Sequence, residues 1–198
     1  MSTQTYDTFV SEYKSRQKSR MLIAAGIMVV GFLLAATGIG AIIGIVAMVY
    51  LVILAVRGSV LRSHTKKSLK VLHKTGVVEK AMAAIGEAQT CQLDELTYAW
   101  NDDYLYLPYG AIYPMEKVAW IHLFTQNLSY MFIFRFSISA CKLFLRDGTQ
   151  SLLFYGKPKD QEAFKRLLIG LKETKPALLL GYSQENQQQY NQITAEKE

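Results

Sequence analysis

The longest stretch of this chain without a charged side chain runs from Met21 to Val56. As one straight helix it would extend about 54 Å, whereas the hydrocarbon core of a bilayer is about 30 Å thick. Gly38 and Gly40 lie near its middle, and glycines weaken a helix and permit a turn. The sequence therefore predicts two short membrane-crossing helices joined near residues 37–40. A single long tilted helix is the alternative, and a buried helix pair in a soluble protein of this size is disfavoured.

Lys and Arg residues flank this run on both sides. Positive residues are retained on the cytoplasmic side of a membrane, so both ends of the run are expected there. Two crossings satisfy both flanks, whereas one crossing would place a basic cluster outside. The expected location is the cell membrane, crossed twice, with both termini and the folded domain in the cytoplasm. The membrane-flank basic residues are Arg16, Lys18, Arg20, Arg57, Arg62, Lys66, Lys67 and Lys70.

Small residues recur every four positions within the run, at Ala36, Gly40 and Gly44. This spacing lets helices approach closely where no hydrophobic force drives them together. It predicts that the two helices pack on each other in preference to forming a dimer, while the oligomeric state stays open. The run holds no ionisable side chain, whereas pumps and ion paths usually place such groups at depth. We therefore expect an integral membrane anchor.

The net charge of +6 is concentrated beside the membrane segment. Residues 57–80 carry seven Lys or Arg and one acidic residue, whereas residues 81–198 carry 11 basic and 13 acidic residues. Nucleic-acid binding would require a basic stripe on the folded domain itself, so no nucleic-acid partner is expected. Attraction of the basic segment to anionic lipid headgroups is the simpler interpretation.

Changes in composition and periodicity divide the chain into segments. Tyr6, Phe9, Val10 and Tyr13 lie at helical spacing, so the N-terminal segment could lie along the membrane, dock on the domain or stay disordered. The expected segments are 1–20 (cytoplasmic N-terminal segment), 21–56 (transmembrane helical hairpin), 57–90 (basic helical linker, broken at Gly76), 91–176 (folded domain) and 177–198 (polar, loosely structured tail).

The apolar pattern changes from helical to strand periodicity near Leu93. Tight turns are predicted at Asn101–Asp103 and at Asp147-Gly148, since Asn, Asp and Gly tolerate the backbone that such turns need. In the strand 116–124, Val118, Trp120, His122 and Phe124 are expected on one face. Further strands are expected over 96–100, 104–107, 111–113, 130–146 and 152–155.

One amphipathic helix is predicted near the end of the domain. Asp160 is a good N-cap, and Phe164, Leu167 and Leu171 continue an apolar stripe that ends before Pro176. Six or seven strands followed by one such helix suggest a small, partly open antiparallel barrel with a C-terminal capping helix at its end.

This order of elements resembles that of a pleckstrin-homology-like (PH-like) domain. More narrowly, the chain resembles an uncharacterised family of bacterial membrane proteins that join a transmembrane hairpin to such a domain. The resemblance implies a membrane-anchored α+β fold and no catalytic residues. The segments that carry it are the hairpin Leu96–Leu107, Ile112–Ile121, the hairpin Leu143–Gly148, the helix Asp160–Glu173, Leu72–Gly76 and Leu180–Ser183.

No motif for catalysis or for cofactor or metal binding is present in the sequence. Cys91 and Cys141 lie far apart and are expected to be reduced, buried thiols. The roles of Arg135, set among aromatic residues, and of His122, in an apolar strand, stay open. We therefore expect no catalytic, cofactor-binding or metal site.

Lipid-reading members of this fold place Lys and Arg on the first hairpin to hold phosphates. Here that region carries only acidic charges, at Asp94, Glu95, Asp102 and Asp103. An anionic phosphate would be repelled, which favours recognition of a protein or peptide, for example as a strand added to a sheet edge. The leading hypothesis is a non-enzymatic membrane-anchored adaptor. The alternatives are an anionic-lipid-binding or membrane-shaping protein acting through its basic linker and, less favoured, a small membrane enzyme or transporter subunit.

Overall fold

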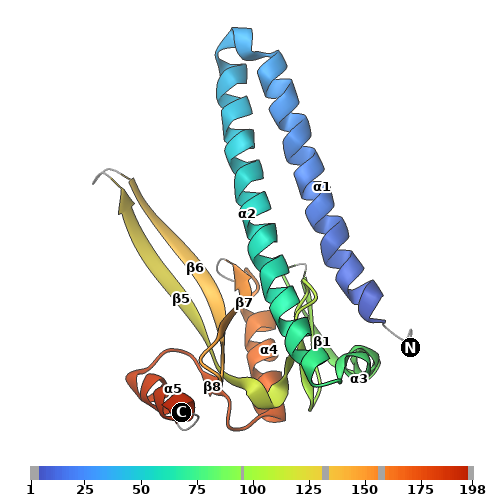
Figure 1. The fold of residues 1–198 in the computed structure, drawn as a ribbon. Helices are drawn as coiled ribbons and strands as arrows, with labels where there is room; N and C mark the ends of the chain where they lie inside the picture. Colours follow the sequence, from blue (N-terminus) through green and yellow to red (C-terminus); the bar gives the residue numbers. More distant parts are fainter. Residues whose placement is uncertain (1–4, 95, 131–133, 156–158, 196–198) are drawn as a thin grey trace.

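The structure is a computed structural model that describes residues 5–94, 96–130, 134–155 and 159–195. It combines helices with mainly antiparallel sheets. Two long helices lie side by side and rise from a body of two β-sheets and shorter helices (Figure 1). The ends of the described chain both lie at the body, away from the turn that joins the long helices (Figure 1).

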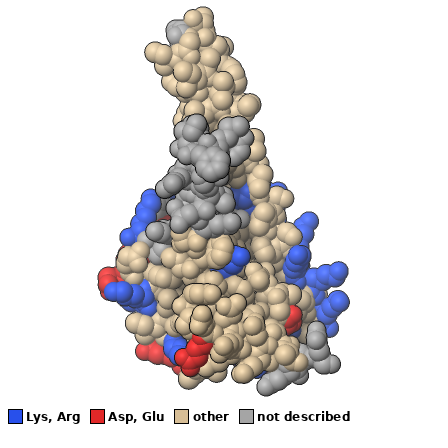
Figure 2. Space-filling model, turned by 90° about the vertical axis from the view of Figure 1, so that its left-hand side faces the viewer, with Lys and Arg blue, Asp and Glu red and all other residues tan. Residues whose placement is uncertain are grey.

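The long helices are α1 (Tyr6–Leu33) and α2 (Ile39–Lys74), joined by the short 3-10 helix η1 (Ala35–Thr37) and by Gly38, which has a φ of 69°. By length and composition, α2 is the one described helix that could cross a membrane. The apolar part of α1 is shorter, because basic residues continue up to Arg20. Figure 2 shows the result, with charges over the body and none on the outer end of the helix pair.

Glycines allow the two helices to approach closely near η1. A Cβ atom placed on Gly31 would lie 2.5 Å from the backbone nitrogen of Gly44, and one on Gly40 would overlap Leu34. Gly40 and Gly44 are thus buried between the helices. Ala36 is not: it is exposed in η1, because α1 ends at Leu33 and the residues after it form the connection.

The strands form two four-stranded sheets. The first has the order β1-β2-β3-β4 and the second the order β7-β6-β5-β8, in which β8 pairs with β5 in parallel and all other pairs are antiparallel. The strands are β1 (Gln89–Leu93), β2 (Leu96–Trp100), β3 (Tyr104–Tyr106), β4 (Ile112–Pro114), β5 (Val118–Tyr130), β6 (Phe134–Leu145), β7 (Gln150–Tyr155) and β8 (Leu179–Leu180).

Both predicted tight turns are confirmed. The Asn101 side-chain oxygen accepts hydrogen bonds from the backbone nitrogens of Asp103 (3.0 Å) and Tyr104 (2.7 Å). In the second turn Gly148 has a φ of 79°, and the Asp147 carboxylate accepts from the Thr149 backbone nitrogen at 2.9 Å. Short polar side chains that bond to nearby backbone explain why these sequences turn.

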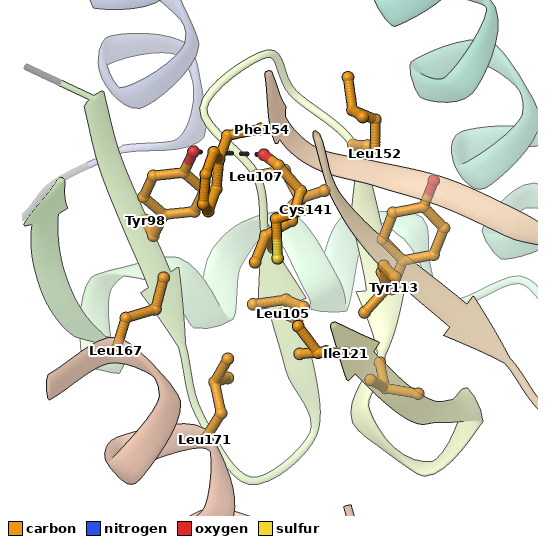
Figure 3. Close-up of a cluster of buried hydrophobic side chains, with 14 of the residues drawn as sticks. Tyr98, Leu105, Leu107, Tyr113, Ile121, Cys141, Leu152, Phe154, Leu167 and Leu171 are labelled. Carbon is orange, nitrogen blue, oxygen red and sulfur yellow. Dashed lines mark hydrogen bonds between the residues drawn. The ribbon is translucent and has the colours of Figure 1, made fainter. Parts of the chain in front are cut away.

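The main core lies between the two sheets and helix α4 (Gln161–Thr174), as Figure 3 shows. Asp160 caps α4 as predicted, accepting a bond of 2.9 Å from the Ala163 backbone nitrogen. Gly170 lets α4 approach Trp100, since a Cβ there would overlap the indole ring. The Tyr98 hydroxyl donates to the Leu153 carbonyl at 3.2 Å, which satisfies a buried polar group.

A second core cluster covers the other face of the first sheet. Phe9 from α1, Leu72 from α2 and Ile85 from η2 (Ala84–Glu87) are buried there against Tyr106 of β3. Short helix α3 (Val78–Ala83) completes this layer. Of the alternatives for the N-terminal segment, docking on the domain is the one observed. The basic stretch after Val56 continues helix α2 without a break and also packs on the body.

Several expectations are corrected by the structure. In the described chain the strands form two four-stranded sheets and no closed barrel, so the expected partly open barrel is not confirmed. A bulge at Ala119 shifts the register, so Val118 joins the main core with Ile121 and does not share a face with Trp120. The predicted loose tail contains helix α5 (Gln184–Ala195), which is held to the second sheet by the buried side chain of Tyr190.

Candidate functional site

A groove of about 780 Å³ lies between strand β1 and the start of helix α4. Such a volume falls in the range of ligand-binding clefts. Its walls combine polar, charged and aromatic side chains. The lining residues are Thr90, Cys91, Gln92, Asp94, Trp100, Lys159, Asp160 and Arg166.

Within the described part of the chain, strand β1 is the edge of the first sheet and pairs with β2 alone. Leu93 pairs with Leu96 across a two-residue connection, and residues that flank such a connection form a hydrogen-bonded pair. Along an antiparallel ladder, hydrogen-bonded pairs alternate with pairs that exchange no hydrogen bonds. Thr90 and Gln92 therefore direct their backbone N–H and C=O groups away from β2. An edge of this kind is a template for another extended chain.

One acidic side chain, Asp94, fixes the end of the groove. The Asp94 carboxylate accepts hydrogen bonds from the backbone nitrogens of Lys159 (2.9 Å) and Asp160 (3.2 Å). This contact ties the β1–β2 turn to the loop before α4. Asp94, which sequence reasoning weighed only as a negative charge, thus positions the groove walls.

The two thiols are not activated. Burial raises the pKa of Cys91, although nearby Arg166 acts in the opposite direction, and the Cys91 sulfur lies 3.5 Å from the Ala163 carbonyl oxygen. Burial alone raises the pKa of Cys141 to about 12. A nucleophilic cysteine needs a lowered pKa, and neither of these two thiols has one.

Aromatic side chains cover the outer face of the second sheet at its base. The Trp120 ring lies 4.3 Å from His122 and 4.8 Å from Phe144 between centroids, and Tyr190 packs at 5.6 Å from Trp120. Burial lowers the pKa of His122, a bond to the Leu123 backbone opposes this, and Lys142 lowers it further. Tyr190 was missed in the sequence because it stands in a polar, glutamine-rich segment.

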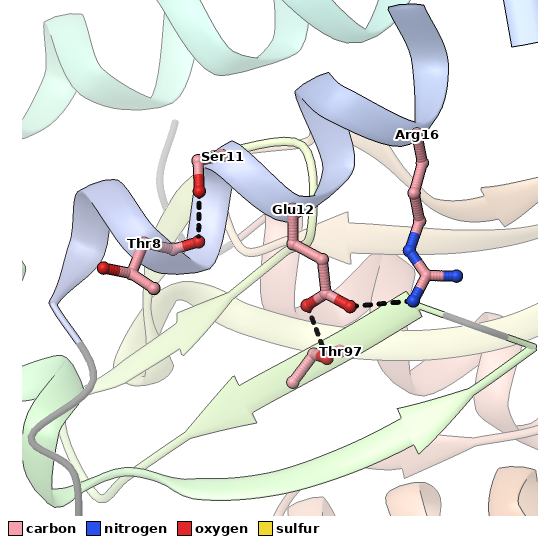
Figure 4. A network of polar contacts seen from close by, with 5 residues as sticks. All are labelled: Thr8, Ser11, Glu12, Arg16 and Thr97. Atoms are coloured by element: carbon pink, nitrogen blue, oxygen red, sulfur yellow. Dashed lines mark hydrogen bonds and ion pairs between the residues drawn. The ribbon is translucent and has the colours of Figure 1, made fainter. Parts of the chain in front are cut away.

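The predicted membrane-flank residues occupy different environments. Arg16 forms an ion pair of 2.9 Å with Glu12, whose carboxylate also accepts a 3.3 Å bond from Thr97 (Figure 4). This network ties α1 to β2. Lys67 lines a cavity of about 320 Å³ between α2 and the β6–β7 turn, and Arg20 lines an apolar groove between the long helices.

Lys18 and Arg62 are brought together. They line a cavity of about 710 Å³ between α1, α2 and the β3–β4 loop. The remaining residues of the predicted set follow along α2, with Arg57 half-buried and Lys66 and Lys70 exposed. The sequence indicated the basic flanks, whereas the pairing of residues from the two helices required the fold.

Comparison with family models, with curated proteins and with solved structures finds no match. Among the described residues, no three His, Cys, Asp or Glu side chains come together in a way that could hold a metal ion. The side chain of Arg135 lies outside the described part of the chain, so its role stays a question from the sequence. The groove, the aromatic face and the cavity are therefore the features of the described chain that could support a function.

Proposed function

We propose that this chain is a non-enzymatic adaptor, anchored in the cell membrane by the apolar halves of α1 and α2, with both termini and a PH-like body in the cytoplasm. The length and hydropathy of α2 and the uncharged outer end of the helix pair support the anchor. The order of strands followed by the capped helix α4 supports the PH-like assignment.

The body binds an extended peptide segment of a protein partner in the groove between β1 and α4. The observation that carries this function is the edge strand β1, whose Thr90 and Gln92 backbone groups face away from β2, beside a groove of about 780 Å³. Main-chain hydrogen bonds to β1 would supply affinity. Asp94, Lys159 and Arg166 would select the side chains of the peptide by charge.

The test uses the full chain in detergent, probed with a displayed library of extended peptides and then with photo-crosslinking. A crosslinker at Gln92, in the groove, should capture the selected peptide, whereas one at the exposed Gln188 on α5 should not. Thr90→Pro removes an outward N–H from an edge strand, a place where proline is tolerated. We expect peptide binding to fall at least tenfold with little change in the unfolding midpoint; equal capture from both positions would refute the site.

Binding of anionic lipid is the second candidate function. The basic residues of α2 follow directly after its apolar half, where polybasic segments meet the headgroups of a membrane. Flotation with anionic vesicles that weakens at high salt would support it, and salt-independent flotation would count against it.

A further inference from the structure

The cavity between α1, α2 and the β3–β4 loop spans the boundary between the charged and the uncharged parts of both long helices. On α1 the lining passes from Lys14 and Lys18 to Met21, Leu22 and Ala25. On α2 it passes from Arg62 and Gly58 to Leu51. One end of the cavity is therefore basic and the other apolar.

The shape of this cavity follows from how the helices are packed. Near η1 the glycines hold the backbones together, whereas at Gly58 the facing contact is the long side chain of Gln17. The helices thus diverge toward the body (Figure 1). The floor is rigid, because Leu61 and Tyr109 belong to the main core and the Tyr13 ring packs edge-on against Tyr109 at 6.5 Å.

The charge of the lining is of one sign. Lys14, Lys18 and Arg62 are its ionisable basic groups, and it contains no Asp or Glu. The nearby carboxylate of Glu12 is already engaged by Arg16 and Thr97. The basic end therefore complements a phosphate, and the apolar end complements hydrocarbon.

We infer that this cavity binds one anionic phospholipid, with its phosphate between Lys14, Lys18 and Arg62 and its acyl chains along Met21, Ala25 and Leu51. The volume of about 710 Å³ accommodates a headgroup and the upper part of the chains. This inference rests on the proposed membrane anchor, because that anchor places the cavity at the headgroup level. It differs from general attraction to a charged surface, since it assigns one lipid to one site.

The experiment measures lipid binding to the full chain by native mass spectrometry in detergent, with phosphatidylglycerol, phosphatidylcholine or inorganic phosphate added. One phosphatidylglycerol should bind per chain in preference to the other two. The variant K14Q/K18Q/R62Q should bind it about 100-fold more weakly, at roughly fivefold per basic residue. The matched control K66Q/K70Q/K74Q removes three exposed charges of α2 that do not line the cavity, and it should bind as the wild type does.

A second pair of variants tests the apolar end without changing any charge. Ala25→Phe fills the cavity and should displace the lipid, whereas Val29→Phe, at an exposed position of the same helix, should not. The site would be overturned if phosphatidylcholine bound as tightly as phosphatidylglycerol, or if both triple variants lost phosphatidylglycerol binding equally. It would also be overturned if Ala25→Phe and K14Q/K18Q/R62Q both retained the lipid. Binding of inorganic phosphate as tight as that of the lipid would reduce it to an anion site.

Failure of the anchor is recognised separately by extracting cell membranes at alkaline pH. Release of the wild-type chain would refute the membrane anchor whatever the binding data show. Retention of every variant in the membrane, with unchanged phosphatidylglycerol binding, would refute the lipid site and leave the anchor intact.

Discussion

At the scale of single residues, the partly buried Lys175 connects segments of the body that lie far apart in the sequence. The Lys175 ammonium donates to the carbonyl oxygens of Met115 (2.6 Å) and Glu116 (2.9 Å), which joins the end of α4 to the link between the two sheets. The pKa of Lys175 is lowered to about 8, mainly by burial and also by nearby Arg146, while Glu116 acts in the opposite direction. This lysine therefore connects the end of α4 to the short 3-10 helix Met115–Lys117 between β4 and β5.

His122 makes the stability of the body depend on pH. Because burial lowers its pKa below the ordinary value of 6.5, the folded state keeps the imidazole neutral while the unfolded chain takes up a proton. The contribution is present above pH 6.5 and is lost as the pH falls below it. We expect His122→Phe to reduce the loss of thermal stability between neutral and mildly acidic pH.

The control for this variant is His73→Gln, which removes an exposed histidine from the end of α2. It should leave the pH profile of the unfolding midpoint as in the wild type. If His122→Phe follows the wild-type profile as well, the buried imidazole does not carry the effect.

At the scale of elements, the glycine contact decides how closely α1 and α2 pack. Gly31→Leu should force the helices apart and cost about 1–3 kcal/mol, since a Cβ there meets the backbone of Gly44. Gly26→Leu is the matched control on the same helix, where a Cβ meets nothing within 4 Å. There the change should be neutral or stabilising by up to about 1 kcal/mol.

Unfolding midpoints of the two variants in the same detergent provide the measurement. Equal shifts for Gly31→Leu and Gly26→Leu would show that the close approach does not contribute to stability.

The C-terminal helix α5 is attached to the body in a different way. Its buried side chain, Tyr190, packs on the second sheet, and the Tyr190 hydroxyl donates a 2.9 Å hydrogen bond to the Leu145 carbonyl.

At the scale of the whole molecule, docking of α1 and α2 on the body fixes the direction of the proposed membrane anchor relative to the body. Phe9 and Val10 are buried in the second core cluster, so the body cannot swing freely beneath the helices. Reporters fused to the N-terminus and to the C-terminus should both be found in the cytoplasm. Opposite locations would contradict two crossings and favour a single tilted helix.

Much of the body could be predicted from the sequence where the cause is local. The Asn101 and Gly148 turns and the Asp160 cap depend on side chains that bond to neighbouring backbone, so their positions were predicted correctly. The bulge at Ala119 and the docking of Tyr190 depend on partners distant in sequence. The groove was not predictable for the same reason, since Arg166 and Thr90 come together only when α4 packs beside β1.

The sequence by itself determined the uncharged run, its basic flanks and the strand periodicity of the body, because hydropathy and turn chemistry are local properties. Only the tertiary structure decided that the basic stretch continues α2 as a helix packed on the body. It also placed Lys14 and Lys18 of one helix opposite Arg62 of the other. That placement depends on how the two helices diverge toward the body, and no local sequence pattern encodes this geometry.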